Sequence, residues 1–517
     1  MFIYDLSPSA GFGTVTAPRL LGLGSNRVAK MVFVALRLFS VAMVALVLAP
    51  ILLCLLCIRL IAKGEINFVT DRYLKPLANI FEWAKDPLRQ ERRSLGLPPA
   101  LIATNEAHGP KLGAKVFADV LVPNDVKETF EWKQRLIQTA TQSLEWSFNF
   151  AGGEPFRLSL RLISEQMTKY PDLRVHLILS NDLFTQQDIE MLEELRKKYV
   201  NFFVLITSRM LRVTGGIRIE ENHVKLLVVD GQYFCFGGSG VHDQMVREVL
   251  TGNEKKVERN LAAKVMDLCF RDSDIIGKAQ TDDNIAETMR GQFFNLYRIC
   301  AQRSNHFLQG VEGNYFPILK PKAQCEHFNI HEKLIHRSAL RFIVSGPEHA
   351  GKNPINLALI QHFQEAKKVI QIASLLMNPS KIVLSAFNNS SAKKIGYFNS
   401  TKNYSLARLG FANLSRQNYH HFSRIYECDI SNQLYHKKVV LMDDNIAYVG
   451  SYNFGIKSDR CDYEVMGIFE DKRVTAILQE GLDEDAKRSG VVVPPLFQSI
   501  RSRLNAAPFT VAGPLIF

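Results

Sequence analysis

Cysteine is scarce in this sequence, and its spacing forms no framework. The 517 residues include eight cysteines, most of them isolated. A disulfide-stapled domain or a zinc ribbon would show closely and regularly spaced cysteines, so we predict neither. Cys54 and Cys57 form a Cys-x-x-Cys pair, but both lie in an apolar run that lacks the access a redox pair needs. Cysteine usage therefore leaves the cellular compartment open.

Signatures of metal and nucleotide binding are incomplete. The run from Gly346 to Lys352 resembles a phosphate-binding loop, but Asn353 stands where that loop needs Ser or Thr to hold magnesium. A polar cluster upstream lacks the His-Glu-x-x-His spacing of a helical zinc site. Its members are His327, His331, Glu332 and His336. We predict no metal and no cofactor.

Acidic residues are outnumbered. The chain has 51 Asp and Glu against 63 Lys and Arg, which gives a formal net charge of +12. Such a balance favours anionic partners: acidic lipid surfaces, nucleic acid, or substrates that carry phosphate. No basic groove interleaved with aromatic residues is evident, so nucleic acid is the weaker candidate without being excluded.

One long apolar run stands near the start of the chain. Residues 38–58 carry no charge and are flanked by Arg37 and Arg59. About 20 apolar residues suffice to cross a bilayer as a helix. We therefore predict a single-pass membrane protein with an N-terminal segment (1–37), a transmembrane helix (38–58) and an amphipathic connector (59–115). Basic residues are balanced on the two sides of the span, so the side on which the body lies is not predicted.

The rest of the chain repeats one pattern twice. Helical and strand-like stretches alternate, which indicates an α/β unit. The first pass has helices at 130–143 and 157–170 with strands at 144–152 and 172–180, and the second has a helix at 358–368 with strands at 369–377 and 393–400. We predict a first half (116–300), a connector (301–338), a second half (339–480) and a tail (481–517). Each half is too thin to bury both faces of a sheet, so we expect one two-lobed, pseudo-symmetric sandwich of sheets flanked by helices.

Each half ends in the same motif. The first motif is His223-x-Lys225-x4-Asp230, and the second is His436-x-Lys438-x4-Asp443. Thirteen histidines would produce on the order of 0.03 such spacings by chance, given ordinary residue frequencies. Two occurrences therefore indicate a duplicated functional site.

The spacing suits chemistry at a phosphodiester. His and Lys two residues apart at the start of a strand share a face. Asp230 and Asp443, at the strand end, complete the two predicted catalytic sets, and their place there indicates turn-fixing residues more than reactants. Small residues after the next strand are predicted to bind phosphate oxygens. They are Gly238, Ser239, Ser451 and Asn453. One neutral imidazole can attack phosphorus while a protonated one serves the leaving oxygen, and the lysines offset the added negative charge.

The paired motifs resemble the phospholipase D superfamily, which includes cardiolipin synthases, transphosphatidylases, phospholipases and some nucleases. The resemblance covers about residues 120–470 and is carried further by FRDSD (270–274), RIYEC (424–428), GSYNFGIKS (450–458) and DYE (462–464). It implies that Asp272 orients His223 and that Glu464 orients His436. It also implies a phosphohistidine on His223, with His436 as the general acid.

Two features depart from the family pattern. Gly240 stands where an Asn is usual, and the interval from the first histidine to Asp272 holds a charged insertion.

Taken with the apolar run and the paired motifs, the sequence predicts a membrane-anchored phosphodiesterase or phosphatidyltransferase that acts on phospholipids, with water or an alcohol as acceptor. A membrane-tethered nuclease and a degenerate, non-catalytic phosphate-binding member are the alternatives. Head-group specificity and oligomeric state are not predicted.

Overall fold

The computed structural model describes residues 113–180, 184–207, 210–212, 218–243, 269–281, 284–303, 325–349, 353–400, 415–428 and 433–492. Within these ranges no helix is both long and apolar enough to span a bilayer. The predicted span at 38–58 lies outside the described residues, as does the charged insertion at 246–260.

The chain divides into two compact units. The described part of the first consists of residues 210–212 and 218–220, which pair as strands β6 (Met210–Arg212) and β7 (Arg218–Asn222). The second unit contains all other described residues, including both motifs.

The second unit is built on one continuous mixed sheet. Its strands follow the order β5-β4-β2-β8-β9-β12-β1-β13-β22-β20-β19-β14-β16-β17-β23. The first-half strands are β1 (Val116–Leu121), β2 (Ser143–Phe148), β4 (Arg174–Ser180), β5 (Phe202–Thr207), β8 (Leu226–Val229), β9 (Tyr233–Gly237) and β12 (Asp274–Ala279). The second-half strands are β13 (Ile335–Ser345), β14 (Val369–Ser374), β16 (Lys393–Asn399), β17 (Arg424–Cys428), β19 (Val439–Met442), β20 (Ile446–Gly450), β22 (Asp462–Glu470) and β23 (Gly490–Val492).

The strand order reveals the duplication. From the outside inward, β5-β4-β2-β8-β9-β12 corresponds to β17-β16-β14-β19-β20-β22, and β1 corresponds to β13. The two central strands pair antiparallel, with Val116 opposite Leu340, so the halves join edge to edge. The predicted α/β fold is thus confirmed, with one refinement: the two lobes share a single sheet.

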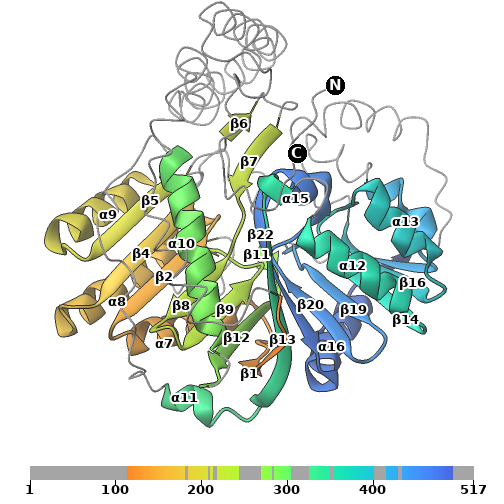
Figure 1. Cartoon of the computed structure of the whole chain (residues 1–517), viewed down its shortest axis with the longest axis horizontal. Helices are drawn as coiled ribbons and strands as arrows, with labels where there is room; N and C mark the ends of the chain where they lie inside the picture. Colours follow the sequence, from red (N-terminus) through yellow and green to blue (C-terminus); the bar gives the residue numbers. More distant parts are fainter. Residues whose placement is uncertain are drawn as a thin grey trace, which may run out of the picture. The chain divides into compact units, whose positions relative to one another are not determined.

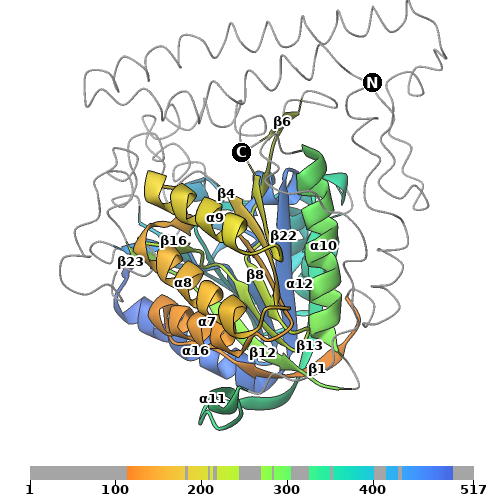
Figure 2. The same cartoon turned by 90° about the vertical axis from the view of Figure 1, so that its left-hand side faces the viewer.

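Helices cover both faces of this sheet (Figures 1 and 2). On one face, α7 (Val126–Thr139), α8 (Gly153–Lys169) and α9 (Gln186–Lys198) pack on the first half, and α12 (Pro354–Glu365) and α13 (Lys381–Asn389) pack on the second. The opposite face is covered by α10 (Ile285–Arg303) and α16 (Lys472–Lys487). Short elements complete the unit: β3 (Ala151–Gly152), β10 (Val241–His242), β11 (Cys269–Arg271), α11 (Glu326–Asn329), β15 (Met377–Asn378), β18 (Gln433–Tyr435), β21 (Phe454–Gly455) and α15 (Ile456–Arg460).

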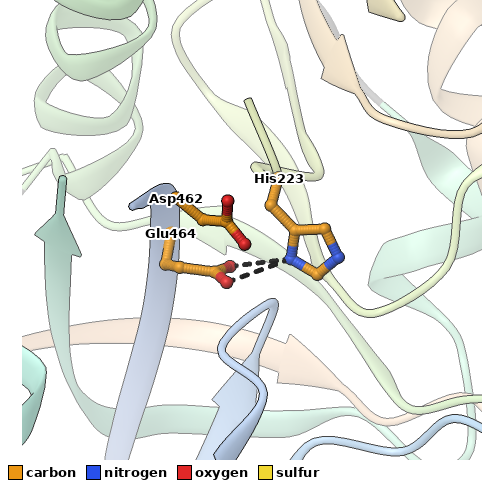
Figure 3. Close-up of side chains that lie close together, drawn as sticks. All are labelled: His223, Asp462 and Glu464. Atoms are coloured by element: carbon orange, nitrogen blue, oxygen red, sulfur yellow. Dashed lines mark hydrogen bonds and ion pairs between the residues drawn. The ribbon is translucent and has the colours of Figure 1, made fainter. Parts of the chain in front are cut away.

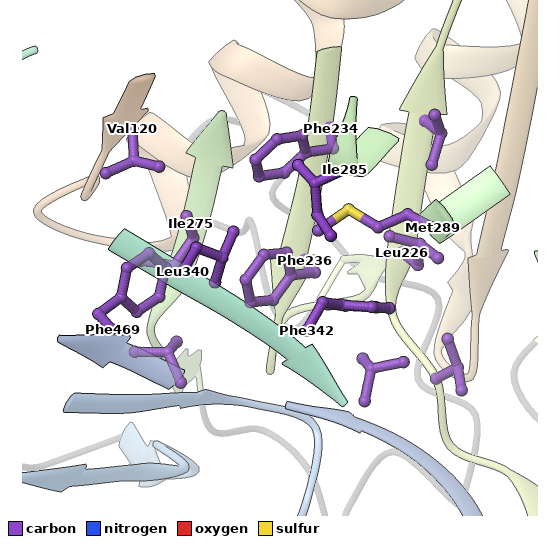
Figure 4. Packing of buried hydrophobic residues seen from close by; sticks show 14 of the residues in the cluster. Val120, Leu226, Phe234, Phe236, Ile275, Ile285, Met289, Leu340, Phe342 and Phe469 are labelled. Atoms are coloured by element: carbon purple, nitrogen blue, oxygen red, sulfur yellow. The ribbon is translucent and has the colours of Figure 1, made fainter. Parts of the chain in front are cut away.

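A shared hydrophobic core binds the two halves together. Phe236 of the first half lies 5.5 Å, ring to ring, from Phe342 of the second (Figure 4). The ring of Phe469 stacks on that of Phe236, and all three side chains are buried. Each such aromatic side chain removes a large apolar area from water, worth about 1.5–3 kcal/mol. The expectation that neither half can bury its sheet alone is consistent with this core.

Local sequence fixes the helix that follows the loop beginning at Gly346. Asn353 is the N-cap of α12, and its side-chain oxygen accepts hydrogen bonds from the backbone N–H groups of Ile355 and Asn356. Pro354 occupies the first turn, where its missing N–H costs nothing. Asn353 is therefore a capping residue, which agrees with the rejection of a nucleotide-binding loop.

The aspartates that end the two motifs fix strand starts. Asp230 has a φ of 52°, and its carboxylate accepts the backbone N–H groups of Thr141, Gln142 and Ser143, where β2 begins. Asp443 (φ 54°) does the same for residues 367–369 before β14. An aspartate tolerates this left-handed backbone better than most residues. Both carboxylates are therefore bound to backbone N–H groups, as the turn-fixing interpretation requires, and their place in the predicted catalytic sets is a structural one.

Loss of the first of these carboxylates should weaken the fold. We expect Asp230→Ala to lower the free energy of unfolding by about 3 kcal/mol, because hydrogen bonds to a buried charged acceptor are lost. Asp443 is less buried, so Asp443→Ala should cost only about 1 kcal/mol on the same grounds. Urea denaturation of the two variants tests this order. Equal losses, or a larger loss for Asp443→Ala, would contradict it.

Candidate active site

The first histidine is held between the two halves of the chain. His223 follows β7, whose end pairs in parallel with β22 at Asn222 and Tyr463. Its backbone N–H donates to the carbonyl of Tyr463 at 3.1 Å. Its ring Nδ1 lies 2.9 Å from Oε2 of Glu464 (Figure 3). Lys225 donates from Nζ to the His223 carbonyl at 2.8 Å.

The second histidine has corresponding partners, with the contributions of the two halves exchanged. His436 follows β18, which pairs in parallel with β11. Its backbone N–H donates to the carbonyl of Arg271 at 2.9 Å, and its Nδ1 lies 2.5 Å from Oδ2 of Asp272. Lys438 donates from Nζ to the His436 carbonyl, as Lys225 does to that of His223, and its Nζ also lies 2.7 and 2.9 Å from Nδ1 and Nε2 of the His436 ring. The two motifs therefore share their backbone and carboxylate contacts, and all of these side chains are buried.

The predicted histidine–carboxylate pairs are wrong in one respect. The sequence assigned Asp272 to His223 and Glu464 to His436, whereas the structure exchanges them. Each histidine contacts the carboxylate of the other half. The cause is the strand pairing, because β7 and β18, which lead into the histidines, pair with β22 and β11 of the opposite half. One composite site results from the two motifs.

Burial and mutual repulsion set the charges of the site. Burial and the Lys225 and Lys438 ammonium groups hold the pKa of His223 well below its usual value. Burial and Lys438 lower the pKa of His436 to about 3. The lysines are themselves affected, since burial lowers the pKa of Lys225 to about 7 and that of Lys438 to about 8. A bound anion would offset the burial and mutual repulsion that lower these two lysine pKa values, so the site favours an anionic ligand.

The two carboxylates differ. Burial raises the pKa of Glu464 to about 7, although Lys225 and two serine hydroxyls act against this. Burial acts in the same direction on Asp272, but Lys438 and His436 outweigh it and bring the pKa of Asp272 below its usual value. Asp272 therefore stays ionised beside His436, whereas Glu464 gains a proton more readily beside His223. The pseudo-symmetry of the site is electrostatically broken.

Two of the four small residues predicted to bind phosphate, Gly238 and Ser451, lie against the carboxylates of the site. Ser451 donates from its hydroxyl to Glu464 at 2.5 Å. Its counterpart Gly238 leaves room for Asp272, because an added Cβ would lie 1.8 Å from Oδ1 of that residue. The backbone N–H of Gly238 donates to the carbonyl of Ser273, and that of Ser451 donates to the carbonyl of Val465. We therefore do not expect these two N–H groups to bind phosphate.

The other two predicted phosphate ligands differ from each other. Ser239 donates its backbone N–H to Asp274 and accepts from the buried Nζ of Lys133 at 2.8 Å, so it anchors the turn after β9. Asn453 donates its backbone N–H to Ser458, but its buried side-chain oxygen has no hydrogen-bond partner among the described residues. An amide oxygen accepts hydrogen bonds, so it suits a donor group of a ligand and not the oxygens of a phosphate.

The departure at Gly240 has a steric explanation. An added Cβ there would lie 2.3 Å from the carbonyl oxygen of Phe150. The ring of Phe150 packs against that of Phe270, and Phe270 lies 4.9 Å from the His436 ring. A glycine at this position therefore allows the close approach of Phe150, whose ring packs beside that of the second histidine.

A second acidic side chain beside His223 and Glu464, that of Asp462, was missed by the sequence interpretation. The ligand atoms of His223, Asp462 and Glu464 lie within 4.8 Å of one another (Figure 3), which is close enough to hold a metal ion. Lys457 forms ion pairs there with Glu221 and Asp462. Asp462 and Glu464 alternate on β22, so their shared face was a signal in the sequence.

The surroundings of this group do not fit a divalent cation. Both oxygens of Glu464 already accept hydroxyl protons, from Ser451 and Ser458. The ammonium groups of Lys225 and Lys438 lower the pKa of His223 through their charge, and they would repel a metal at the same place. We interpret the group as a network that holds His223, with Lys457 in the place of a cation.

The second half of the chain matches a known protein family. Residues 359–486 match the family model "Cardiolipin synthase, PLD-like domain". The chain is 22% identical over 349 residues to "Cardiolipin synthase 1" of Bacillus cereus and to the protein of the same name from Bacillus anthracis. Each match covers 65% of this chain and 60% of the relative, so the chain spans somewhat less than two thirds of their length.

A solved structure shows the same fold. The crystal structure of phosphatidylserine synthase from Haemophilus influenzae Rd KW20 has a TM-score of 0.53 at 13% identity, covering 80% of this chain and 98% of the other. The predicted resemblance to the phospholipase D superfamily is thereby confirmed. Within that superfamily, the second half of the chain is similar to the domain of cardiolipin synthases.

Proposed function

We propose that this chain is a membrane-associated phosphatidyltransferase of the phospholipase D type, acting on phospholipids through a phosphohistidine. One observation carries the proposal: each half contributes a His–Lys pair, and each histidine is bound by a carboxylate of the other half. Two imidazoles and two ammonium groups thus converge on one anion-attracting site. The similarity to proteins named cardiolipin synthase favours phospholipid as the substrate.

In the first chemical step, His223 attacks phosphorus. With Nδ1–H donated to Glu464, the Nε2 lone pair of the neutral ring is the nucleophile. The bond from phosphorus to the head-group oxygen breaks, and His436 gives that oxygen a proton. Lys225 and Lys438 offset the charge of the five-coordinate transition state. The products are a free alcohol and a phosphatidyl group bound to His223.

In the second step, His436 acts as the base. It takes the proton of an acceptor hydroxyl, whose oxygen attacks phosphorus and displaces His223. An alcohol acceptor gives a new phospholipid, and water gives phosphatidic acid. His223 returns to its neutral form and His436 to its protonated form, so protons and bonds balance over the cycle.

The assignment of the two histidines rests on their carboxylates. A general acid must be protonated, and anionic Asp272 stabilises an imidazolium at His436. Without substrate, Lys438 lies at Nε2 of His436 and opposes protonation. A bound phosphodiester would draw that ammonium group to its oxygens, and its own negative charge would raise the pKa of His436. Glu464, which gains a proton more readily, leaves His223 neutral as a nucleophile requires.

Product analysis tests the proposal. Vesicles of radiolabelled phosphatidylglycerol, incubated with purified full-length protein and a primary alcohol, should yield the phosphatidyl-alcohol. Without the alcohol, phosphatidic acid should appear more slowly. Activity should survive EDTA, because lysines supply the positive charge that a metal would otherwise provide.

Parallel incubations separate the alternatives. Cleavage of DNA or RNA with intact lipid would indicate the tethered nuclease. No product from lipid, DNA or RNA would indicate the non-catalytic member, and loss of activity in EDTA with recovery on one divalent ion would indicate different chemistry. The predicted span at 38–58 would keep the enzyme at the bilayer. A full-length protein that stays in solution without detergent or membrane would refute that part.

A further inference from the structure

A buried carboxylate lies behind the second histidine. Asp485, near the end of α16, has no exposed surface. It forms ion pairs with Arg271 and with Lys437, whose Nζ lies 2.8 Å from Oδ2. The hydroxyl of Tyr435 donates to the same oxygen at 3.0 Å. Three side chains, one from β11 of the first half and two from β18 and the residues just after it, thus meet on one carboxylate.

The three partners are the sequence neighbours of the reacting pair. Tyr435 and Lys437 flank His436, and Arg271 precedes Asp272. Arg271 and Tyr435 are also opposite each other in the β11–β18 pairing. Because neighbours in an extended chain point to opposite sides, binding these residues on one side directs their neighbours to the other. Asp485 therefore fixes both partners of the His436–Asp272 hydrogen bond at once.

The first half has no ionic counterpart at these positions. Asn222 and Val224 flank His223, where Tyr435 and Lys437 flank His436. Asn222 donates from its side chain to the hydroxyl of Ser147 at 3.0 Å, and Val224 carries no charge. The support from α16 thus belongs to one histidine of the two. That asymmetry suits a pair of histidines with different tasks.

We propose that Asp485 is a positioning residue that acts through Arg271 and Lys437 to hold the His436–Asp272 pair in its hydrogen-bonded geometry. The proposal rests on the proposed function, in which His436 protonates the leaving group. Helix α16 is a rigid anchor for this purpose, since Val474, Leu478 and Leu482 lie in the core that the halves share. Residues that orient a reacting histidine typically contribute about 10–100-fold to its efficiency.

The leaving group of the substrate provides the test. Asp485→Asn should lower kcat about 10–100-fold on a phospholipid with an alkoxide leaving group, with KM nearly unchanged. The first turnover of a nitrophenyl phosphodiester, whose leaving group needs no proton, should change less than about threefold. Loss of folded protein would lower kcat on phospholipid and the burst amplitude of the nitrophenyl substrate by the same factor, and would leave the first-turnover rate unchanged. Asp483→Asn, an exposed change on the same helix, should have no effect.

A double-mutant cycle with Asp272→Asn separates this proposal from the proposed function. If Asp485 acts through Asp272, the double variant should be no slower than Asp272→Asn alone. Multiplying effects, or an Asp485→Asn variant as fast as wild type, would overturn the positioning role. Suppose that the effects of Asp485→Asn and Asp272→Asn do not multiply, but that Asp485→Asn slows both substrates equally. That result would support the positioning role and refute His436 as the general acid. If Asp485→Asn does not fold, Lys437→Met and Tyr435→Phe each remove one contact and should give smaller losses of the same pattern.

Discussion

His223→Ala is expected to form no phosphoryl-enzyme with any substrate, whereas His436→Ala should still form one when the leaving group is good. With a nitrophenyl phosphodiester, His436→Ala should release one equivalent of nitrophenol in a burst and then turn over slowly. On phospholipid, both variants should lose at least about 10⁴-fold in kcat, because nucleophile and general acid act as one unit. Rapid-quench kinetics and acid-labile label on the protein measure both outcomes.

The reason lies in what each histidine must do. Only a neutral ring with a free Nε2 can form the covalent bond, and His223 has the carboxylate partner that gains a proton more readily. His436 donates a proton to the leaving group in the first step and accepts one from the acceptor in the second. A leaving group that needs no proton therefore makes His436 unnecessary in the first step only. The burst is expected because the second step still needs His436 to deprotonate the acceptor.

The reverse pattern would exchange the roles. Label on His436 in the wild type, or a burst in His223→Ala, would assign the nucleophile to the second motif and leave a two-histidine mechanism in place. Label in neither variant, with activity retained in both, would refute the phosphohistidine altogether. His362→Ala is a suitable control, because that histidine lies on α12 and bonds Tyr448 instead of a carboxylate of the site.

Much of the fold follows from local patterns in the sequence. The repeated motif predicted two equivalent strand–turn units, and the turn role of Asp230 follows from its place at the end of an apolar run. These are properties of a few consecutive residues, set by the alternation of side chains along a strand. Patterning alone also indicated that the halves must pack together.

The pairing of each histidine with the carboxylate of the other half could not be predicted in the same way. The pairing that joins His223 to Glu464 spans 241 residues and depends on a two-residue contact between β7 and β22. Sequence order favoured the carboxylate in the same half, and nothing local contradicts that choice. Asp485 is hidden for a similar reason, because its partners lie on strands about 50 and more than 200 residues away. Close approaches such as that of Gly240 to Phe150 are likewise visible only in three dimensions.

The crossed pairs predict opposite phenotypes for the two carboxylates. Asp272→Asn should resemble loss of His436: about 10³-fold slower on phospholipid, with a retained burst from the nitrophenyl substrate. Glu464→Gln should resemble loss of His223, with slow formation of the phosphoryl-enzyme whatever the leaving group. The cause is that an amide in place of the carboxylate no longer holds the imidazole in the tautomer and orientation that its step requires. Burst amplitude and burst rate, measured separately, distinguish the two.

Pairing within each half would give the reverse result, with the burst abolished in Asp272→Asn and retained in Glu464→Gln. Glu470→Gln is the matched control, since it makes the same chemical change on the same strand, where Glu470 bonds Lys115 and Arg341 instead of a histidine. That variant should keep full activity with a small loss of stability. Because both tested carboxylates are buried, thermal unfolding of each variant must accompany the kinetics. A loss of folded protein scales burst amplitude and leaves the burst rate unchanged, so it does not imitate slow attack by His223.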